Sequence, residues 1–158
     1  MTALWLKALG MGLLILAGAG GGWSLYRYHL SRWRAVCTFI RLLELLRETI
    51  YYRALPCEEA LSYAASDPAF AAFHLERCRT YAEIPMPQEL ERTCGPELRE
   101  GLSSLSSASR SSACRTLASL CAICRRTETE FHAKAEQTKQ TAPRLGGCLG
   151  LLAAILLA

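Results

Sequence analysis

The sequence predicts an all-α protein, in which a compact helical bundle lies between an N-terminal transmembrane helix and a short C-terminal transmembrane segment. Uncharged apolar residues gather at both ends of this 158-residue chain, of which 51% is hydrophobic. Apolar residues between the two ends recur every three or four positions, the period of an amphipathic helix. No stretch alternates apolar and polar residues as a half-buried strand would. We therefore expect an N-terminal membrane anchor over residues 1–26, a helical domain over 27–144 and a C-terminal membrane segment over 145–158.

The N-terminal anchor is predicted from residues 8–26, which carry no charge and lie between Lys7 and Arg27. A helix of this length spans about 28 Å, close to the apolar thickness of a bilayer. Arginines follow at once, and basic residues mark the cytoplasmic side of a membrane segment. The small residues 17–19 also fit a signal-peptide cleavage site, which leaves a secreted, disulfide-bonded binding domain as an alternative. Because Lys7 is the only basic residue before the apolar run, an uncleaved anchor and a cytoplasmic domain are favoured.

The first part of the domain is predicted to be a long helix that continues from the anchor and ends at Pro56. Its apolar stripe consists of Trp33, Val36, Ile40, Leu43, Leu46 and Ile50. A short helix should follow, with two glutamates in its first turn, where the helix dipole favours acids. Asp67 and Pro68 form a start signal for the next helix, as N-cap and first helical residue. That helix should run on towards Tyr81.

A further helix is expected to begin near Pro87 and to be kinked near Gly95 and Pro96. Residues 103–112 contain seven serines, which is typical of a loop whose hydroxyl groups can cap the following helix.

The long return helix is predicted over about residues 112–141, and Pro143 should break it. Its apolar stripe consists of Ala113, Leu117, Leu120, Cys124, Phe131 and Ala135. The uncharged residues 145–158 would span only about 21 Å as a helix, so a bilayer would have to thin around them. The alternative is a hydrophobic plug on the domain.

Eight cysteines raise a second alternative, a membrane-bound thiol or metal protein that uses Cys114, Cys121 and Cys124. These three residues fall on one face of the long return helix. Cysteine pairs that bind zinc usually lie on turns, where their sulfur atoms can converge, and a redox pair needs a helix N-terminus. We therefore expect the three thiols to pack as small apolar side chains in the core.

No motif of a catalytic class is present. The sequence has no phosphate-binding loop, no nucleophile elbow and no dinucleotide-binding fingerprint, and its histidines are isolated from one another. The net charge of +4 is too small to indicate a nucleic-acid-binding protein. We therefore predict a protein that is not an enzyme, with no catalytic, cofactor-binding or metal-binding residue, no small-molecule substrate and no nucleic-acid partner.

Several residues stand at spacings found in one known family. A tyrosine lies four positions before a proline that opens a Glu-Ala-Leu turn, and the last apolar segment begins Leu-Gly-x-x-x-Gly. The matching residues are Tyr52, Pro56, Glu59, Ala60, Leu61, Leu145, Gly146 and Gly150. In these residues and in its layout the chain resembles the stage III sporulation protein AB family of endospore-forming bacteria. It departs from the pattern at Thr49, where an acid is usual, at Cys57, where leucine is usual, and in the serine-rich stretch.

The resemblance implies a platform protein of the channel between mother cell and forespore. Such a protein would lie in the mother cell membrane that faces the forespore, with its helical domain in the cytoplasm. Its fold would resemble the cytoplasmic domain of the type II secretion platform protein. Its partners would be other sporulation channel proteins, including a secretion-type ATPase, and membrane lipids.

Five residues are predicted to carry specific roles in this platform. Tyr52 and Pro56 should set the turn between the long helix and the short helices that follow. The candidates for residues that face a partner are Arg41, Arg47 and Arg53, because exposed arginines are enriched at protein interfaces.

Overall fold

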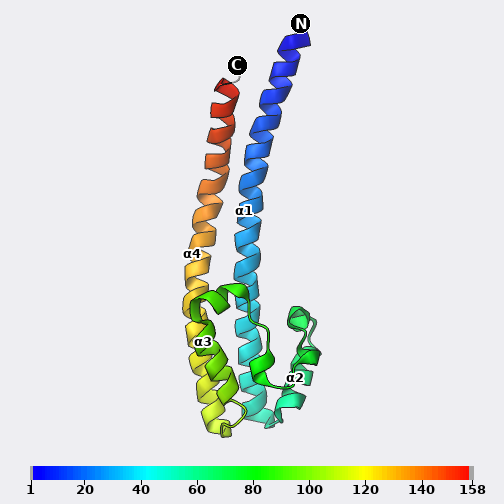
Figure 1. The fold of residues 1–158 in the computed structure, drawn as a ribbon, viewed down its shortest axis with the longest axis vertical. Coiled ribbons are helices and arrows are strands. Elements are labelled where there is room, and N and C mark those ends of the chain that lie inside the picture. The colour runs from blue at the N-terminus through cyan, green and yellow to red at the C-terminus, as the bar shows by residue number, and fades with distance from the viewer. Residues whose placement is uncertain (1, 157–158) are drawn as a thin grey trace. The chain divides into compact units, whose positions relative to one another are not determined.

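The computed structural model describes the backbone of residues 2–156 and the side chains of residues 23–134, together with a few isolated side chains on either side. Every regular element within these residues is helical, which confirms the all-α prediction. The elements are α1 (Thr2–Glu48), the π-turn η1 (Thr49–Arg53), α2 (Cys57–Ala65), the 3₁₀ turns η2 (Pro68–Phe73), η3 (Leu75–Arg77) and η4 (Tyr81–Glu83), α3 (Gln88–Ser104) and α4 (Arg110–Leu156) (Figure 1).

The chain divides into two compact units. One consists of residues 34–130 and holds the hydrophobic core; we call it the helical domain. The other consists of residues 1–33 and 131–158, the first part of α1 and the last part of α4. Among the described residues, no helix is both long and apolar enough to cross a membrane. Most side chains of the predicted anchors, 1–26 and 145–158, lie outside the described residues, so both anchors stay predictions.

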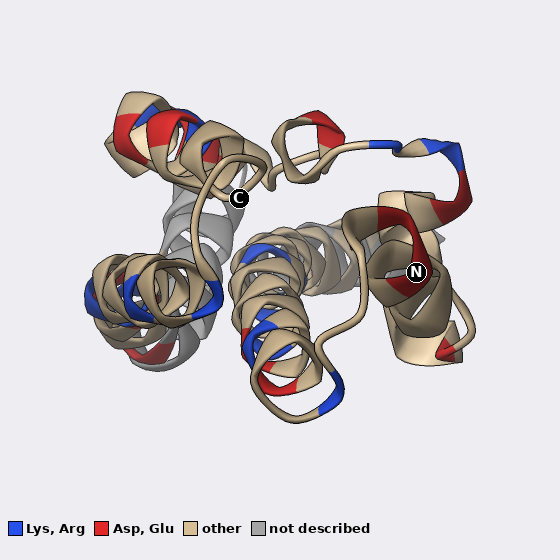
Figure 2. Ribbon diagram, turned by 90° about the horizontal axis from the view of Figure 1, so that it is seen from below, with Lys and Arg blue, Asp and Glu red and all other residues tan. Residues whose placement is uncertain are grey.

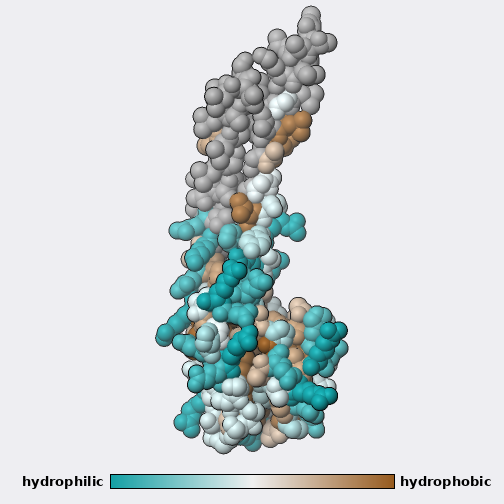
Figure 3. All heavy atoms as spheres, in the orientation of Figure 1, coloured by the Kyte–Doolittle hydropathy of each residue, from teal (hydrophilic) through white to brown (hydrophobic). Residues whose placement is uncertain are grey.

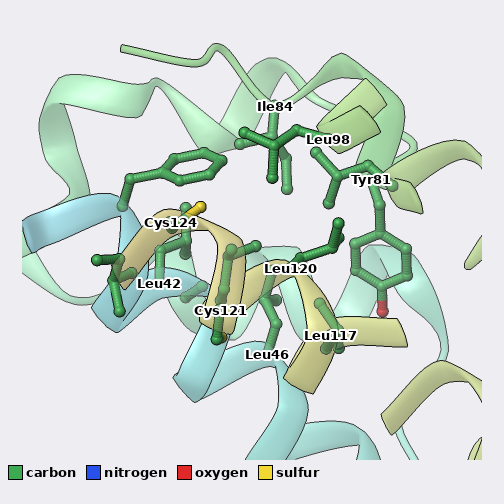
Figure 4. Packing of buried hydrophobic residues seen from close by; sticks show 14 of the residues in the cluster. Leu42, Leu46, Tyr81, Ile84, Leu98, Leu117, Leu120, Cys121 and Cys124 are labelled. Atoms are coloured by element: carbon green, nitrogen blue, oxygen red, sulfur yellow. The ribbon is translucent and has the colours of Figure 1, made fainter. Parts of the chain in front are cut away.

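Within the helical domain, α1 contributes the apolar stripe that the sequence predicts. Val36, Ile40, Leu43, Leu46 and Ile50 are buried, as expected, and Trp33, which belongs to the other unit, is half-buried. Phe39 and Leu42 are also fully buried, so the buried face of α1 is wider than the predicted stripe. A wider face is needed because α1 packs against more than one neighbour. In Figure 4 its Leu42 and Leu46 lie beside Leu117, Leu120 and Cys121 of α4.

The long helix ends a few residues earlier than predicted. It passes into the π-turn η1, and Ala54 then adopts a left-handed conformation with φ 50°. Pro56 is the N-cap of α2, and its carbonyl oxygen accepts a hydrogen bond from the Ala60 N–H at 3.0 Å. Helix α2 has glutamates in its first turn, and it buries Ala60, Leu61 and Ala64.

The single helix predicted from Pro68 towards Tyr81 is wrong, because this segment forms three short 3₁₀ turns. Its start is as predicted: the Asp67 carboxylate accepts a hydrogen bond from the Ala69 N–H at 2.9 Å, and Pro68 is the first helical residue. His74 then breaks the helix with φ 47°. The break has a packing reason. Phe70, Phe73 and Leu75 are all buried, and a straight α-helix would point Leu75 away from the face that buries the two phenylalanines.

Helix α3 begins directly after Pro87 and is kinked where predicted. Cys94, next to Gly95 and Pro96, has non-helical backbone angles of φ −141° and ψ 22°. Proline has no N–H to donate within the helix, and its ring crowds the preceding turn, so the kink follows from Pro96.

The serine-rich stretch forms a turn over residues 105–109, which is shorter than predicted because its two ends belong to α3 and α4, and one of its serines caps α4. The Ser109 hydroxyl oxygen accepts a hydrogen bond from the Ser112 N–H at 3.4 Å. The break predicted at Pro143 is wrong, because α4 continues through this position to Leu156.

The core of the helical domain joins α1, the small helices, α3 and α4. Phe39 of α1 meets Phe73 of η2 edge to face, with ring centroids 5.8 Å apart. Leu98 and Leu102 of α3 are fully buried. On the outside, Arg125 of α4 forms an ion pair with Glu44 of α1. On the face of the helical domain that Figure 3 shows, hydrophilic and near-neutral side chains cover most of the surface, and the core residues are buried.

Candidate functional site: a tyrosine–arginine surface

The cysteines of α4 form part of the core. Cys121 and Cys124 are buried, and burial raises the pKa of the Cys124 thiol to about 12. Burial also raises the pKa of Cys121. Both thiols therefore stay neutral and pack as apolar groups, which confirms that they belong to the core; Cys114 is half-buried at its edge. All eight cysteines are free, and no group of three or more potential ligands within the described residues is arranged to hold a metal ion.

The helical domain also has large, mainly apolar side chains that are exposed at its surface. Among the described residues of this domain, the exposed large hydrophobic side chains are three tyrosines, Tyr51, Tyr52 and Tyr63, at 57%, 78% and 39% exposure. Two of them lie on the π-turn η1 and the third lies on α2. Tyrosine at the surface provides a rigid apolar face with a polar end, which is typical of a binding surface.

Arginines lie against these tyrosines. Tyr51 and Tyr52 pack edge to face, with ring centroids 4.8 Å apart. The guanidinium carbon of Arg110, at the start of α4, lies 5.7 Å from the centre of the Tyr51 ring. The guanidinium carbon of Arg53 lies 4.4 Å from the centre of the Tyr63 ring. These cation–π contacts orient the aromatic rings and link η1 to both α2 and α4.

A groove of about 500 Å³ runs between the end of α1, η1 and the start of α4. Its lining residues are Arg47, Glu48, Tyr51, Tyr52, Cys114, Arg115 and Ala118. We call this groove together with Arg110 the tyrosine–arginine surface. Figure 2, which views the molecule from the end where α1 stops and α4 begins, shows basic positions on both of these helices.

The structure brings some of the predicted residues to this surface. Tyr52 and Arg47 line the groove, and Arg53 lies beside it on Tyr63. Arg41 is exposed on α1 but does not line the groove. Pro56 is exposed and starts α2, next to the turn that it is predicted to set.

Sequence reasoning did not find the part of the surface that α4 supplies. Arg110 and Arg115 come close to Tyr51 only because the chain returns after α3. No local pattern in the sequence predicts that the start of α4 will lie beside η1. Tyr51 could have been found, because two adjacent tyrosines beside an apolar stripe cannot both face the core.

The side chains of the tyrosine–arginine surface carry more positive than negative charge. Three arginines, Arg47, Arg110 and Arg115, contribute to it, and Glu48 is the only acid that lines the groove. None of the three arginines forms an ion pair within the described part of the chain. The arrangement therefore offers aromatic faces and unneutralised positive charge, which suits recognition of another macromolecule.

Comparison with known proteins gives one family. Residues 7–80 match the model of stage III sporulation protein AB, which covers nearly half of the chain, from α1 to the segment after η3. No curated protein and no solved structure matches the chain. The matched region includes Arg47, Tyr51 and Tyr52, whereas the arginines of α4 lie beyond it. By this match, residues 7–80 of the chain are similar to the stage III sporulation protein AB family.

Proposed function

We propose that this protein is a non-enzymatic membrane platform of the channel between mother cell and forespore that sporulation requires. The observation that carries the proposal is the family match. The matched residues include both the apolar N-terminal segment and the helix that ends beside the exposed tyrosines. A sporulation protein built in this way has an apolar segment suited to a bilayer and a surface suited to a partner.

The proposed mechanism is positional. The segments 1–26 and 145–158 act as anchors in the mother cell membrane that faces the forespore, and the helical domain stays in the cytoplasm. Arg27, Arg32 and Arg34 follow the first anchor directly and would contact anionic lipid headgroups. The helical domain then presents its surface to a secretion-type ATPase and to other channel proteins. Among the described residues of this domain, the exposed large apolar side chains are the three tyrosines, which are therefore available to a partner.

The location of the domain can be tested with the native cysteines. Sporulating cells are treated with a membrane-impermeant maleimide, with and without an impermeant reductant, and are compared with lysed cells. The half-buried Cys57, Cys78 and Cys114 are the reporters, since the deeply buried thiols react slowly in either place. The expected result is a full-length chain in the membrane fraction that is labelled only after lysis.

Labelling of intact cells would contradict the proposal. If it required the reductant and the chain had lost its first residues, the secreted, disulfide-bonded alternative would be correct. The platform role itself is tested by isolating the chain from detergent-solubilised membranes. Copurification of the ATPase is expected, and its absence at low salt would refute the proposed partner.

A further inference from the structure

We propose that the tyrosine–arginine surface binds an acidic segment of a partner protein, with Tyr52 as the central anchor of the contact. This inference rests on the proposed function, which supplies the partner protein as the ATPase of the channel. It adds the chemistry of recognition: carboxylates on the partner meet Arg47, Arg110 and Arg115, and an apolar side chain beside them packs on Tyr52.

The surface has the composition of an interaction site. Tyrosine and arginine are enriched among the residues that contribute most to protein binding. Here the two types are combined, since Tyr51 packs against Tyr52 and the guanidinium group of Arg110 lies over the Tyr51 ring. The tyrosine rings therefore lose little conformational freedom when a partner covers them, which lowers the entropic cost of binding. Tyr52 is 78% exposed, so most of its apolar face is available for burial in a complex.

The charge of the surface selects the kind of partner. The first turn of α4 contains no acid, whereas that of α2 contains Glu58 and Glu59. An acid in the first turn would neutralise the positive end of the helix dipole, and α4 has Arg110 there instead. Positive charge at this position is unfavourable for the isolated helix. It becomes favourable when carboxylates of a partner approach.

The shape of the surface favours a protein segment over an anionic membrane. Anionic membranes are bound by clusters of about four to eight basic side chains, whereas three arginines contribute to this surface. Here the basic residues lie around a concave groove of about 500 Å³ that two tyrosines line. Side chains of a peptide segment would contact the two tyrosines that line this groove.

The experiment compares charge reversal at this surface with the same charge reversal elsewhere on the helical domain. The test variant is Arg47→Glu combined with Arg115→Glu, since both residues line the groove. The matched control is Arg77→Glu combined with Arg92→Glu, since both residues are exposed and lie outside it. A third variant, Tyr52→Ala, removes the aromatic anchor and keeps the charge. Far-UV circular dichroism establishes that each full-length chain keeps its helical content.

Affinity for the purified ATPase is measured with the full-length chain in phosphatidylcholine nanodiscs, at about 50 and about 200 mM salt. The double reversal and Tyr52→Ala should each weaken binding by about tenfold or more, while the control pair stays within about threefold of the wild type. The affinity of the wild type should fall with salt, and that of the double reversal should depend less on salt.

Each other outcome has a distinct meaning. If the wild type binds the ATPase and the two test variants bind equally well, the inference is overturned and the proposed function stands. If the wild type does not bind the ATPase, the proposed function fails and the inference falls with it. Loss of ATPase binding when phosphatidylglycerol is added to the nanodiscs would assign the surface to anionic lipid and overturn the inference. Loss of self-association in the double reversal, with ATPase binding retained, would assign it to a second copy of the chain.

Discussion

Gly101 of α3 lies against Leu120 of α4, and its replacement by alanine tests how tightly the two helices pack. A β-carbon at this position would lie 2.6, 3.0 and 3.2 Å from the Cδ2, Cδ1 and Cγ atoms of Leu120. Leu120 is only 3% exposed, so its side chain has little room to move. Alanine favours a helix over glycine by about 1 kcal/mol, whereas extra volume in a packed core costs about 1–3 kcal/mol. Gly101→Ala should therefore destabilise the domain, by up to about 2 kcal/mol.

The sign of this effect should reverse when Leu120 is shortened. Leu120→Ala alone should cost about 2–5 kcal/mol, because it leaves a cavity between the helices. In that background the new methyl group at position 101 has space, and only the helix preference of alanine remains. Gly101→Ala should then stabilise the chain by about 1 kcal/mol, which corresponds to a coupling energy of about 1–3 kcal/mol between the two positions.

Chemical denaturation of the full-length chain in detergent micelles, followed by far-UV circular dichroism, measures all four members of this cycle. Glu100→Ala serves as control, because Glu100 is the exposed neighbour in the same helix and its replacement should change stability by no more than about 0.5 kcal/mol. The close approach of α3 and α4 would be refuted if Gly101→Ala had the same effect with leucine and with alanine at position 120.

The remaining predictions concern turns and thiols. Pro56→Ala should lower the melting midpoint by a few degrees, because proline restricts the unfolded chain by about 0.4–1 kcal/mol; an unchanged midpoint would refute its role in the turn. Asp67→Ala should lower the unfolding free energy by about 1 kcal/mol through loss of the hydrogen bond to the Ala69 N–H, and Asp67→Asn should retain most of the stability. At pH 8, Cys124 should react with maleimide at least about a hundredfold more slowly than in the unfolded chain, as mass spectrometry can show, since its pKa is raised to about 12. The pKa of Cys37 is raised to about 11 by burial and by its hydrogen bond to a carboxylate. This thiol therefore favours folding below pH 9, and its contribution to stability is lost as the pH rises towards 11. Cys37→Ala should flatten the decline in the free energy of unfolding over this pH range.

The sequence is informative about the fold wherever a helix buries one continuous face. Val36, Ile40, Leu43 and Leu46 repeat at three- and four-residue spacings, and all are buried in α1. The kink at Pro96 also follows from local chemistry, since proline lacks an N–H whatever surrounds it. The buried face of α1 extends to Phe39 and Leu42 because several neighbours cover it, and periodicity alone does not give the number of neighbours.

The segment after α2 shows where local signals are insufficient. The start at Asp67 is local, because the cap and the proline act within one turn. The end at His74 is set by tertiary packing, since Phe73 and Leu75 can both be buried only if the chain turns between them. Helix propensity is a weak preference, and the burial of two large side chains outweighs it.

The candidate site was hard to predict because it depends on a change of helical phase at the end of α1. If the stripe that contains Leu46 and Ile50 had continued with α-helical spacing, Arg53 or Ala54 would face the core. Both are exposed instead, because η1 is a π-turn with more residues per turn. The sequence around Thr49 contains no proline or glycine that would predict the change from α-helix to π-turn. The buried Thr49 hydroxyl donates a hydrogen bond to the Leu45 carbonyl at 2.8 Å, so even its polar group is satisfied within the helix. The π-turn therefore places the two adjacent tyrosines outside the core, and the groove beside them forms because α4 returns next to η1.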